Sequence, residues 1–190
     1  MSDADRAKWD ERYRTGAYAD RPHASTLLQD WIDRVPRGRA LDVACGAGRN
    51  ALFLAAQGFD VDAVDISAEG LARARRTAAE RGLTVHWVEH DLDQPLALAD
   101  GYTLILVVRF LDLPLIRRLG HRLAPGGFLI CEEHLRTDAE VIGPGNPAFR
   151  AAPGQLGEAA AGLEILQYEE GLFDDPDGRK AALARLVARR

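Results

Sequence analysis

The pattern of apolar and polar residues predicts two helices before the first strand. Residues 1–15 read as a helix that ends at Gly16, with Trp9 and Tyr13 four apart on one face. Residues 24–35 read as a second helix whose apolar side chains form one stripe. A stripe of this kind indicates that the second helix packs against a core.

The rest of the chain alternates between strands and helices. The apolar runs with the length of buried strands are residues 39–43, 59–66, 83–88, 102–108 and 128–132. The predicted helices between them are residues 49–57, a helix capped by Ser67 that runs to Arg81, and residues 114–123. This alternation predicts a parallel α/β sheet with right-handed crossovers.

The C-terminal part does not continue the alternation of strands and helices. Residues 143–157 are rich in proline and glycine and are expected to form a loop. Residues 163–170 and 179–188 read as two strands separated by the turn at 174–178, a pattern that predicts an antiparallel hairpin.

The first crossover carries the most informative chemistry. Asp42 lies in the first strand, Gly46 and Gly48 form a tight turn, and Asp65 lies near the end of the second strand. In a dinucleotide site this turn wraps a pyrophosphate, which Asp42 would repel. A methionine moiety with an ammonium and a sulfonium would be attracted instead. The pattern therefore indicates S-adenosylmethionine, with Asp65 accepting hydrogen bonds from the ribose hydroxyls.

Two other interpretations of this turn stay open. One is a nicotinamide dinucleotide site in which Ala51 takes the place of the third glycine. The other is a glycine turn without a ligand. Cys45, inside the turn, is interpreted as a small packing residue rather than a nucleophile.

Two further strand ends hold candidate binding residues. Asp91 follows the third strand and could accept a hydrogen bond from an adenine amine, with Leu92 and Ile66 flanking the ring. Arg109 ends the apolar fourth strand, where an unpaired cation is costly. It is therefore expected to pair with a nearby acid such as Asp112 or with an anionic substrate.

A metal site is not expected. Residues 86–90 match the zinc-protease pattern H-x-x-E-H, which requires a helix so that both histidines share a face. This segment reads as a strand, which would separate His86 and His90 by roughly 13 Å.

Composition limits the class of protein. The 190 residues are 47% hydrophobic and 28% charged, which is ordinary for a folded chain, and the net charge is −5. That charge argues against a nucleic-acid partner. The absence of a long apolar run argues against a membrane span or a secretory signal, and the location is expected to be cytoplasmic. We expect a single domain over residues 1–190, with 1–37 as helices that form a lid and 38–190 as the core, acting as a monomer or weak homodimer.

Several segments resemble the motifs of class I S-adenosylmethionine-dependent methyltransferases. They are residues 38–50, 64–67, 109–111, 125–127 and 143–149. They are most similar to the small branch that includes tellurite-resistance and thiopurine-type methyltransferases, and the resemblance runs from Trp9 to the C-terminus. Ala44 departs from the glycine usual at its position, while Glu133 and His134 stand where such relatives carry Thr and Phe.

The resemblance implies a Rossmann-like, doubly wound α/β sheet of seven strands in the order 3-2-1-4-5-7-6, with the last strand antiparallel. It implies S-adenosyl-L-methionine as cofactor and S-adenosyl-L-homocysteine as product, and Trp9 and Tyr13 match a helix that covers the methionine end. The implied cofactor contacts are Asp42, Ala44, Gly46, Gly48, Asp65, Ile66, Asp91, Leu92 and Val107.

The expected reaction is methyl transfer to a small-molecule acceptor with a soft or anionic nucleophile. Alignment of the reacting atoms supplies most of the catalysis, about 7–11 kcal/mol. Arg109 is expected to steer an anion, and His134 or Glu133 to remove a proton from a neutral acceptor, with His134 having the better resting pKa. A non-catalytic sensor of S-adenosylmethionine remains the alternative, and a nicotinamide-dependent oxidoreductase is a weaker one.

Overall fold

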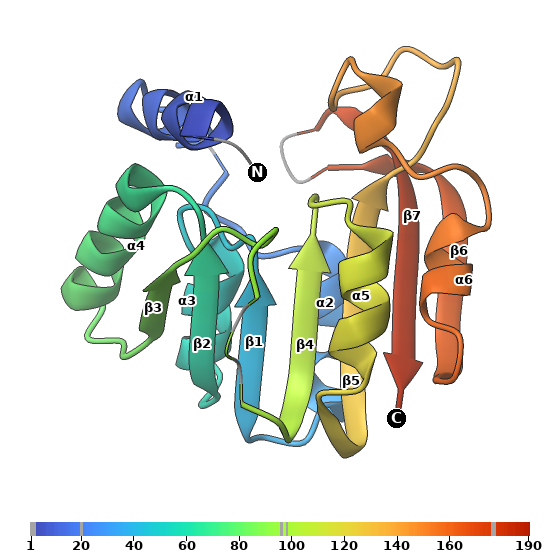
Figure 1. Cartoon of the computed structure of the whole chain (residues 1–190), viewed down its shortest axis with the longest axis horizontal. Helices are drawn as coiled ribbons and strands as arrows, with labels where there is room; N and C mark the ends of the chain where they lie inside the picture. The colour runs from blue at the N-terminus through green and yellow to red at the C-terminus, as the bar shows by residue number, and fades with distance from the viewer. Residues whose placement is uncertain (1–2, 20, 96, 98, 176–177) are drawn as a thin grey trace.

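A computed structural model describes residues 3–19, 21–95, 97, 99–175 and 178–190. Its centre is a seven-stranded sheet with the strand order β3-β2-β1-β4-β5-β7-β6, which confirms the expected order (Figure 1). The strands are β1 (Arg39–Val43), β2 (Asp60–Asp65), β3 (His86–Glu89), β4 (Tyr102–Val108), β5 (Leu123–His134), β6 (Glu164–Asp174) and β7 (Lys180–Arg189).

The strand directions fix where a ligand can bind. β1 pairs in parallel with β2 on one side and with β4 on the other, so the strand order reverses at β1. β7 runs antiparallel to both β5 and β6, which confirms the predicted hairpin. Open α/β sheets bind ligands outside the carboxyl ends of the strands at such a reversal.

Helices cover both faces of the sheet (Figure 1). The helical segments are α1 (Asp3–Arg14), α2 (Thr26–Trp31), η1 (Ile32–Arg34), α3 (Arg49–Ala56), α4 (Ala68–Glu80), α5 (Leu113–Gly120), η2 (Pro147–Phe149) and α6 (Gln155–Ala159). α2, α3 and α4 contribute to one apolar core, and α5 and α6 to the other. Side chains of β4 alternate between these cores, with Leu104 and Leu106 in the first and Ile105 and Val107 in the second.

Side chains cap the start of two helices, and one of these caps was predicted. The Ser67 hydroxyl accepts a hydrogen bond from the Gly70 amide at 3.1 Å, which confirms it as the cap of α4. Asp112 caps α5 in the same way, through the Leu115 amide at 2.8 Å. Both caps satisfy amide groups that the first turn of a helix leaves unpaired.

Several predicted boundaries need correction. The second helix is α-helical only over Thr26–Trp31 and continues as the 3-10 turn η1. Leu123 belongs to β5, because it pairs with Tyr102 before the bulge formed by the Pro125-Gly126-Gly127 turn. The third strand spans His86–Glu89 instead of the expected residues 83–88. The expected loop contains η2 and the start of α6, where Gly154 adopts a positive φ of 84° before the helix.

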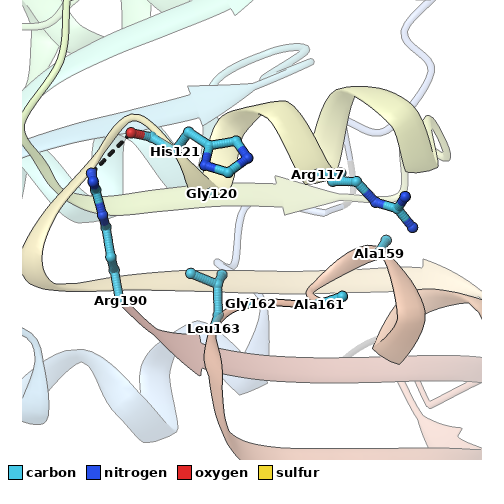
Figure 2. A pocket seen from close by; sticks show the side chains of 8 residues that line it. All are labelled: Arg117, Gly120, His121, Ala159, Ala161, Gly162, Leu163 and Arg190. Carbon is cyan, nitrogen blue, oxygen red and sulfur yellow. Dashed lines mark hydrogen bonds between the residues drawn. The ribbon is translucent and has the colours of Figure 1, made fainter.

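A small cavity of ≈ 80 Å³ lies where α5 ends and β5 begins (Figure 2). Arg117, His121, Leu163 and Arg190 line part of it. It lies near the start of β4, at the other end of the sheet from the carboxyl end of that strand. It is also far smaller than the ~300–1,000 Å³ of typical ligand sites. In the part of the chain that the structure describes, no helix has both the length and the apolar character needed to cross a bilayer.

Candidate functional site

The turn after β1 contains three residues with left-handed backbone. Ala44, Gly46 and Gly48 all have positive φ angles, of 54°, 57° and 79°. Left-handed backbone is easy for glycine but strained for alanine. The turn therefore keeps its expected shape despite Ala44, at a cost in strain.

Asp42 is the acid at the centre of this site. Its side chain is 1% exposed, and its Oδ2 atom has no hydrogen-bond partner among the described residues. Burial raises the pKa of this carboxyl to about 7, while the nearby Arg49 charge lowers it. A buried carboxylate oxygen without a donor is costly unless a ligand supplies one. An ammonium group of a methionine moiety fits this requirement.

Asp65 stabilises the same turn from the neighbouring strand. Its Oδ2 accepts the Gly46 amide at 2.7 Å and its Oδ1 accepts the Ser67 amide at 2.9 Å. Burial raises the pKa of Asp65, and these amide hydrogen bonds oppose the shift. Each carboxylate oxygen can accept more than one hydrogen bond, so these two bonds leave room for ribose hydroxyls. The ribose contacts themselves remain a prediction.

The N-terminal helix α1 lies over this turn (Figure 1). Asp10 Oδ1 accepts hydrogen bonds from the Ser67 hydroxyl at 2.6 Å and the Glu69 amide at 3.2 Å, which joins α1 to the start of α4. Tyr13 stacks with Trp9, with ring centroids 6.2 Å apart. A Cβ atom built on Gly46 would lie 2.2 Å from the Tyr13 hydroxyl oxygen. Tyr13 thus contacts the glycine turn directly.

The residues expected at the adenine end follow β2 and β3 in the chain. Ile66 and Leu92 are each 3% exposed. The His90 amide donates to the Asp65 carbonyl at 2.9 Å, which holds the ends of the two strands together. Asp91 is half-buried, and its Oδ1 accepts the Asp93 amide at 3.0 Å. Contact of these groups with an adenine ring remains a prediction.

The histidines of the H-x-x-E-H pattern belong to a strand edge. β3 spans His86–Glu89, so the strand interpretation is confirmed. His86 Nδ1 lies 2.7 Å from Asp62 Oδ1 on the neighbouring strand, which gives it a structural partner. Within the described residues, no group of three or more His, Cys, Asp or Glu could hold a metal ion.

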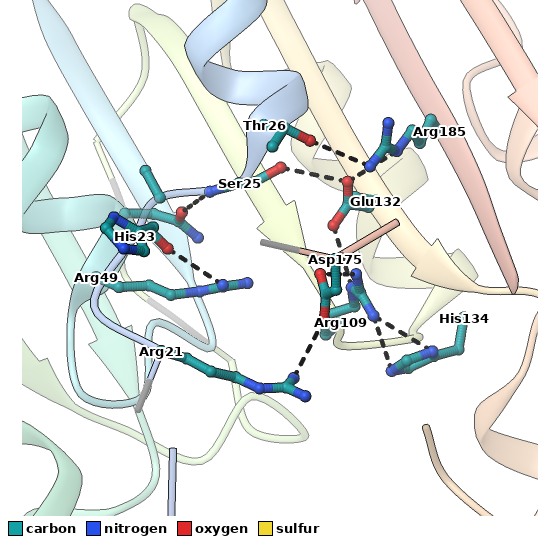
Figure 3. A network of polar contacts seen from close by, with 12 residues as sticks. Arg21, His23, Ser25, Thr26, Arg49, Arg109, Glu132, His134, Asp175 and Arg185 are labelled. Atoms are coloured by element: carbon teal, nitrogen blue, oxygen red, sulfur yellow. Dashed lines mark hydrogen bonds and ion pairs between the residues drawn. The ribbon is translucent and has the colours of Figure 1, made fainter. Parts of the chain in front are cut away.

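Arg109 lies at the centre of a second cluster, at the carboxyl ends of β4 and β5 (Figure 3). Its Nε contacts Glu132 Oε1 at 3.1 Å, and its Nη2 contacts Asp175 Oδ1 at 3.2 Å. Arg109 thus pairs with acids as expected, but these are Glu132 and Asp175, whereas Asp112, the acid suggested by the sequence, caps α5. Arg109 has a positive φ of 62°, which turns the chain sharply after the fully buried Val107 and the largely buried Val108.

Glu132 connects this cluster to two other elements. Its Oε2 accepts the Ser25 hydroxyl at 3.3 Å and lies 3.0 Å from Arg185 Nε, although the angle at Arg185 is too poor for a hydrogen bond. The distance still makes an ion pair, because Coulomb attraction depends little on the angle. Glu132 is therefore held by two arginines and a hydroxyl in a buried network.

Glu133 and His134 have environments that the sequence did not reveal. Glu133 is 1% exposed, its Oε1 has no partner among the described residues, and burial raises its pKa well above the usual value. His134 Nε2 lies 3.3 Å from Arg109 Nη1. Burial, together with the charges of Arg109, Arg150 and Arg21, lowers the pKa of His134 to about 3. The expectation that His134 has a resting pKa suited to proton removal is therefore wrong.

Five charged residues of this cluster were missed by sequence reasoning. They are Arg21, Arg49, Glu132, Asp175 and Arg185. Arg49 follows the glycine turn directly and could have been found from that position. The other four come from separate segments, and no local pattern marks them.

The comparisons with known proteins give a consistent result. Residues 40–127 match the family described as a methyltransferase domain. The chain is 34% identical over 154 residues to the ribosomal RNA small subunit methyltransferase G of Ralstonia nicotianae, covering 71% of this chain and 68% of that protein. It is 27% identical over 165 residues to a probable S-adenosyl-L-methionine-dependent methyltransferase, TehB, of Haemophilus influenzae, covering 80% of this chain and 57% of that protein.

A solved structure supports the fold. The crystal structure of TehB from Haemophilus influenzae superimposes with a TM-score of 0.75 at 24% identity, covering 95% of this chain and 67% of that one. The chain thus spans a little over half to two thirds of the length of these relatives.

Proposed function

The chain belongs to the class I S-adenosylmethionine-dependent methyltransferases, and we propose that its acceptor is a small molecule bearing an anionic group that binds beside Arg109. The cofactor of this family is S-adenosylmethionine. Membership favours an enzyme over the sensor and the nicotinamide-dependent oxidoreductase that the sequence left open.

The residues around the first turn fit this cofactor. Asp42 would bind the methionine ammonium, since its buried Oδ2 lacks a donor among the described residues. Asp65 would bind the ribose, and Ile66, Asp91 and Leu92 the adenine. We propose that α1 acts as a lid, with Tyr13 and Trp9 excluding water from the methionine end. Ala44, Gly46, Gly48 and the strand end at Val107 would contact the cofactor through their backbones.

The cofactor supplies a methyl group on a positively charged sulfur; the acceptor's lone pair forms the new bond to carbon while the carbon–sulfur electrons remain on sulfur. The chain's contribution is to align the acceptor and exclude water. Arg109 would orient an anionic group of the acceptor. His134, which is neutral above a pKa of about 3, would accept a hydrogen bond from Arg109 Nη1, 3.3 Å from its Nε2, and so hold the guanidinium in place.

The proposed reaction does not need a strong general base. With a lowered pKa, His134 is a weak base, and burial raises the pKa of Glu133 well above its usual range. An acceptor that is already anionic or has a soft nucleophilic atom needs neither. We therefore propose such an acceptor, and we assign His134 or Glu133 to proton removal only for a neutral one.

The observation that carries this proposal is the burial of the arginines at the acceptor end. The side chains of Arg109, Arg185 and Arg21 are 15%, 12% and 20% exposed. Cations that bind an RNA backbone need to reach an extended row of phosphates, and the chain has a net charge of −5. Enclosed guanidinium groups suit a small anion better than ribosomal RNA, on which one relative is named to act.

A radiolabelled methyl screen tests this function. The protein would be incubated with S-adenosylmethionine labelled in its methyl group and with thiols, metalloid oxyanions, small carboxylic acids, small amines and 16S ribosomal RNA. We expect label in one of the small anionic or soft acceptors, and a loss of turnover of at least about tenfold in Arg109→Gln. Label in the RNA alone would contradict the proposal.

A further inference from the structure

One carboxylate at the acceptor end comes from the β6–β7 hairpin. Asp175 directly follows β6, and its side chain is 9% exposed. Its Oδ1 lies 3.2 Å from Arg109 Nη2, and its Oδ2 lies 3.5 Å from Arg21 Nη1. The carboxylate therefore lies between two guanidinium groups from distant parts of the chain (Figure 3).

Arginines outnumber carboxylates among the described residues of this cluster. Arg185 and Arg109 both contact Glu132, and Arg109 and Arg21 both contact Asp175. Arg49 extends toward the same space, and its guanidinium donates only to the His23 carbonyl, at 3.2 Å, among the described residues (Figure 3). Among the described residues, three arginines thus contact two carboxylates, and a fourth arginine lies nearby.

The two carboxylates are held differently. Glu132 is in the middle of the sheet and has three side-chain partners. Asp175 is held at its backbone by the turn: its amide donates to the Arg179 carbonyl at 2.8 Å, and its carbonyl accepts the Gly178 amide at 2.8 Å. Because these backbone bonds do not involve the carboxylate, the side chain can leave the arginines without breaking the turn.

We propose that the Asp175 carboxylate occupies the binding position of the acceptor's anionic group and is displaced from Arg21 and Arg109 when the acceptor binds. This inference rests on the proposed function, because it assigns the arginine cluster to the acceptor. The ligand class is a carboxylate, phosphate or similar oxyanion. Asp175 also sets specificity, since an acceptor has to compete with a carboxylate that is already in place.

Calorimetric titration with inorganic phosphate tests this inference. The protein is first saturated with S-adenosylhomocysteine, so that the carboxylate of the donor is already bound at its own position. We expect phosphate to bind this complex, to bind Asp175→Asn about tenfold more tightly than wild type, and to bind Arg109→Gln at least tenfold more weakly.

Asp174→Asn is the matched control. Asp174 is the neighbouring acid, 73% exposed and paired with Lys180 at 2.8 Å, so its replacement should leave phosphate affinity unchanged. Equal or weaker phosphate binding by Asp175→Asn overturns the inference. So does the absence of phosphate binding in the complex with S-adenosylhomocysteine, which would assign the arginines to the donor.

A measurement on the wild-type chain covers the case in which Asp175→Asn does not fold. Phosphate should shift the amide NMR resonances of Asp175 and Gly178 while leaving that of the exposed Asp100 in place. An unshifted Asp175 resonance at saturating phosphate overturns the inference. These titrations test the displacement of Asp175 and need no turnover. The methyl screen tests the proposed function, so the two claims can fail independently.

Discussion

Tyr13 and Gly46 approach each other so closely that the glycine has no room for a side chain. A Cβ atom on Gly46 would lie 2.2 Å from the Tyr13 hydroxyl oxygen, and the φ angle of Gly46 is 57°. Gly46→Ala should therefore displace Tyr13 and α1 as well as strain the backbone. We expect an affinity for S-adenosylhomocysteine at least about tenfold lower, measured by calorimetry.

Gly58→Ala is the control for this change. Gly58 also has a positive φ, of 84°, but a Cβ there meets nothing within 4 Å. It should lose about 1 kcal/mol of unfolding free energy from backbone strain and keep its ligand affinity. Equal ligand affinity in both variants would show that Tyr13 does not matter for binding.

Asp42 should make ligand binding depend on pH. Its folded pKa is raised to about 7, so the carboxyl becomes protonated below that value and loses its attraction for an ammonium. We expect the affinity for S-adenosylhomocysteine to fall as pH decreases from 7.5 to 5.5, approaching about tenfold per pH unit. Calorimetry across this range measures it, and an affinity independent of pH would contradict the assignment.

The same carboxyl should lower stability at neutral pH in the absence of ligand. A raised folded pKa means that the folded state binds more protons than the unfolded state between pH 3.8 and about 7. The unfolding free energy therefore falls as pH rises through this window. Asp42→Asn should raise the unfolding free energy at pH 8 by on the order of 3 kcal/mol while abolishing ligand affinity. Asp60→Asn, at an exposed position on β2, should change neither.

Ala44→Gly should stabilise the protein. Ala44 has a φ of 54°, which costs about 1–2 kcal/mol for a residue with a side chain, and glycine recovers this at the cost of a more flexible unfolded chain. We expect a net gain of about 0.5–1 kcal/mol in denaturant unfolding. Ala47→Gly, in the same turn but without a positive φ, should instead lose about 0.5–1 kcal/mol.

Glu132 and Glu133 should respond differently to replacement by glutamine. Glu132 compensates Arg109 and Arg185 in a buried network, so Glu132→Gln should lose about 3 kcal/mol of unfolding free energy. Glu133 is buried with an unpartnered Oε1 within the described chain, so Glu133→Gln should be neutral or stabilising by about 1 kcal/mol. Denaturant unfolding at pH 8 compares them, and equal losses would contradict the network.

The sequence predicted the elements where the signal was local. β1 and β4 have the predicted bounds, because an apolar run buried on both faces needs no partner to be recognised. Ser67 was identified as a cap because its bond partner is three residues away. Leu123 was assigned to a helix because its pairing with Tyr102 across the sheet leaves no mark in the neighbouring residues.

The sequence by itself determined the site proposed for the cofactor: Asp42, the glycine turn and Asp65 lie within one crossover, whose short connections fix their relative positions. The tertiary structure decided the arginine cluster that we propose for the acceptor. Arg21, Arg109, Glu132 and Asp175 meet only when four distant segments pack together. It also decided the protonation state of His134, because burial and neighbouring charges, which no local pattern contains, set its pKa.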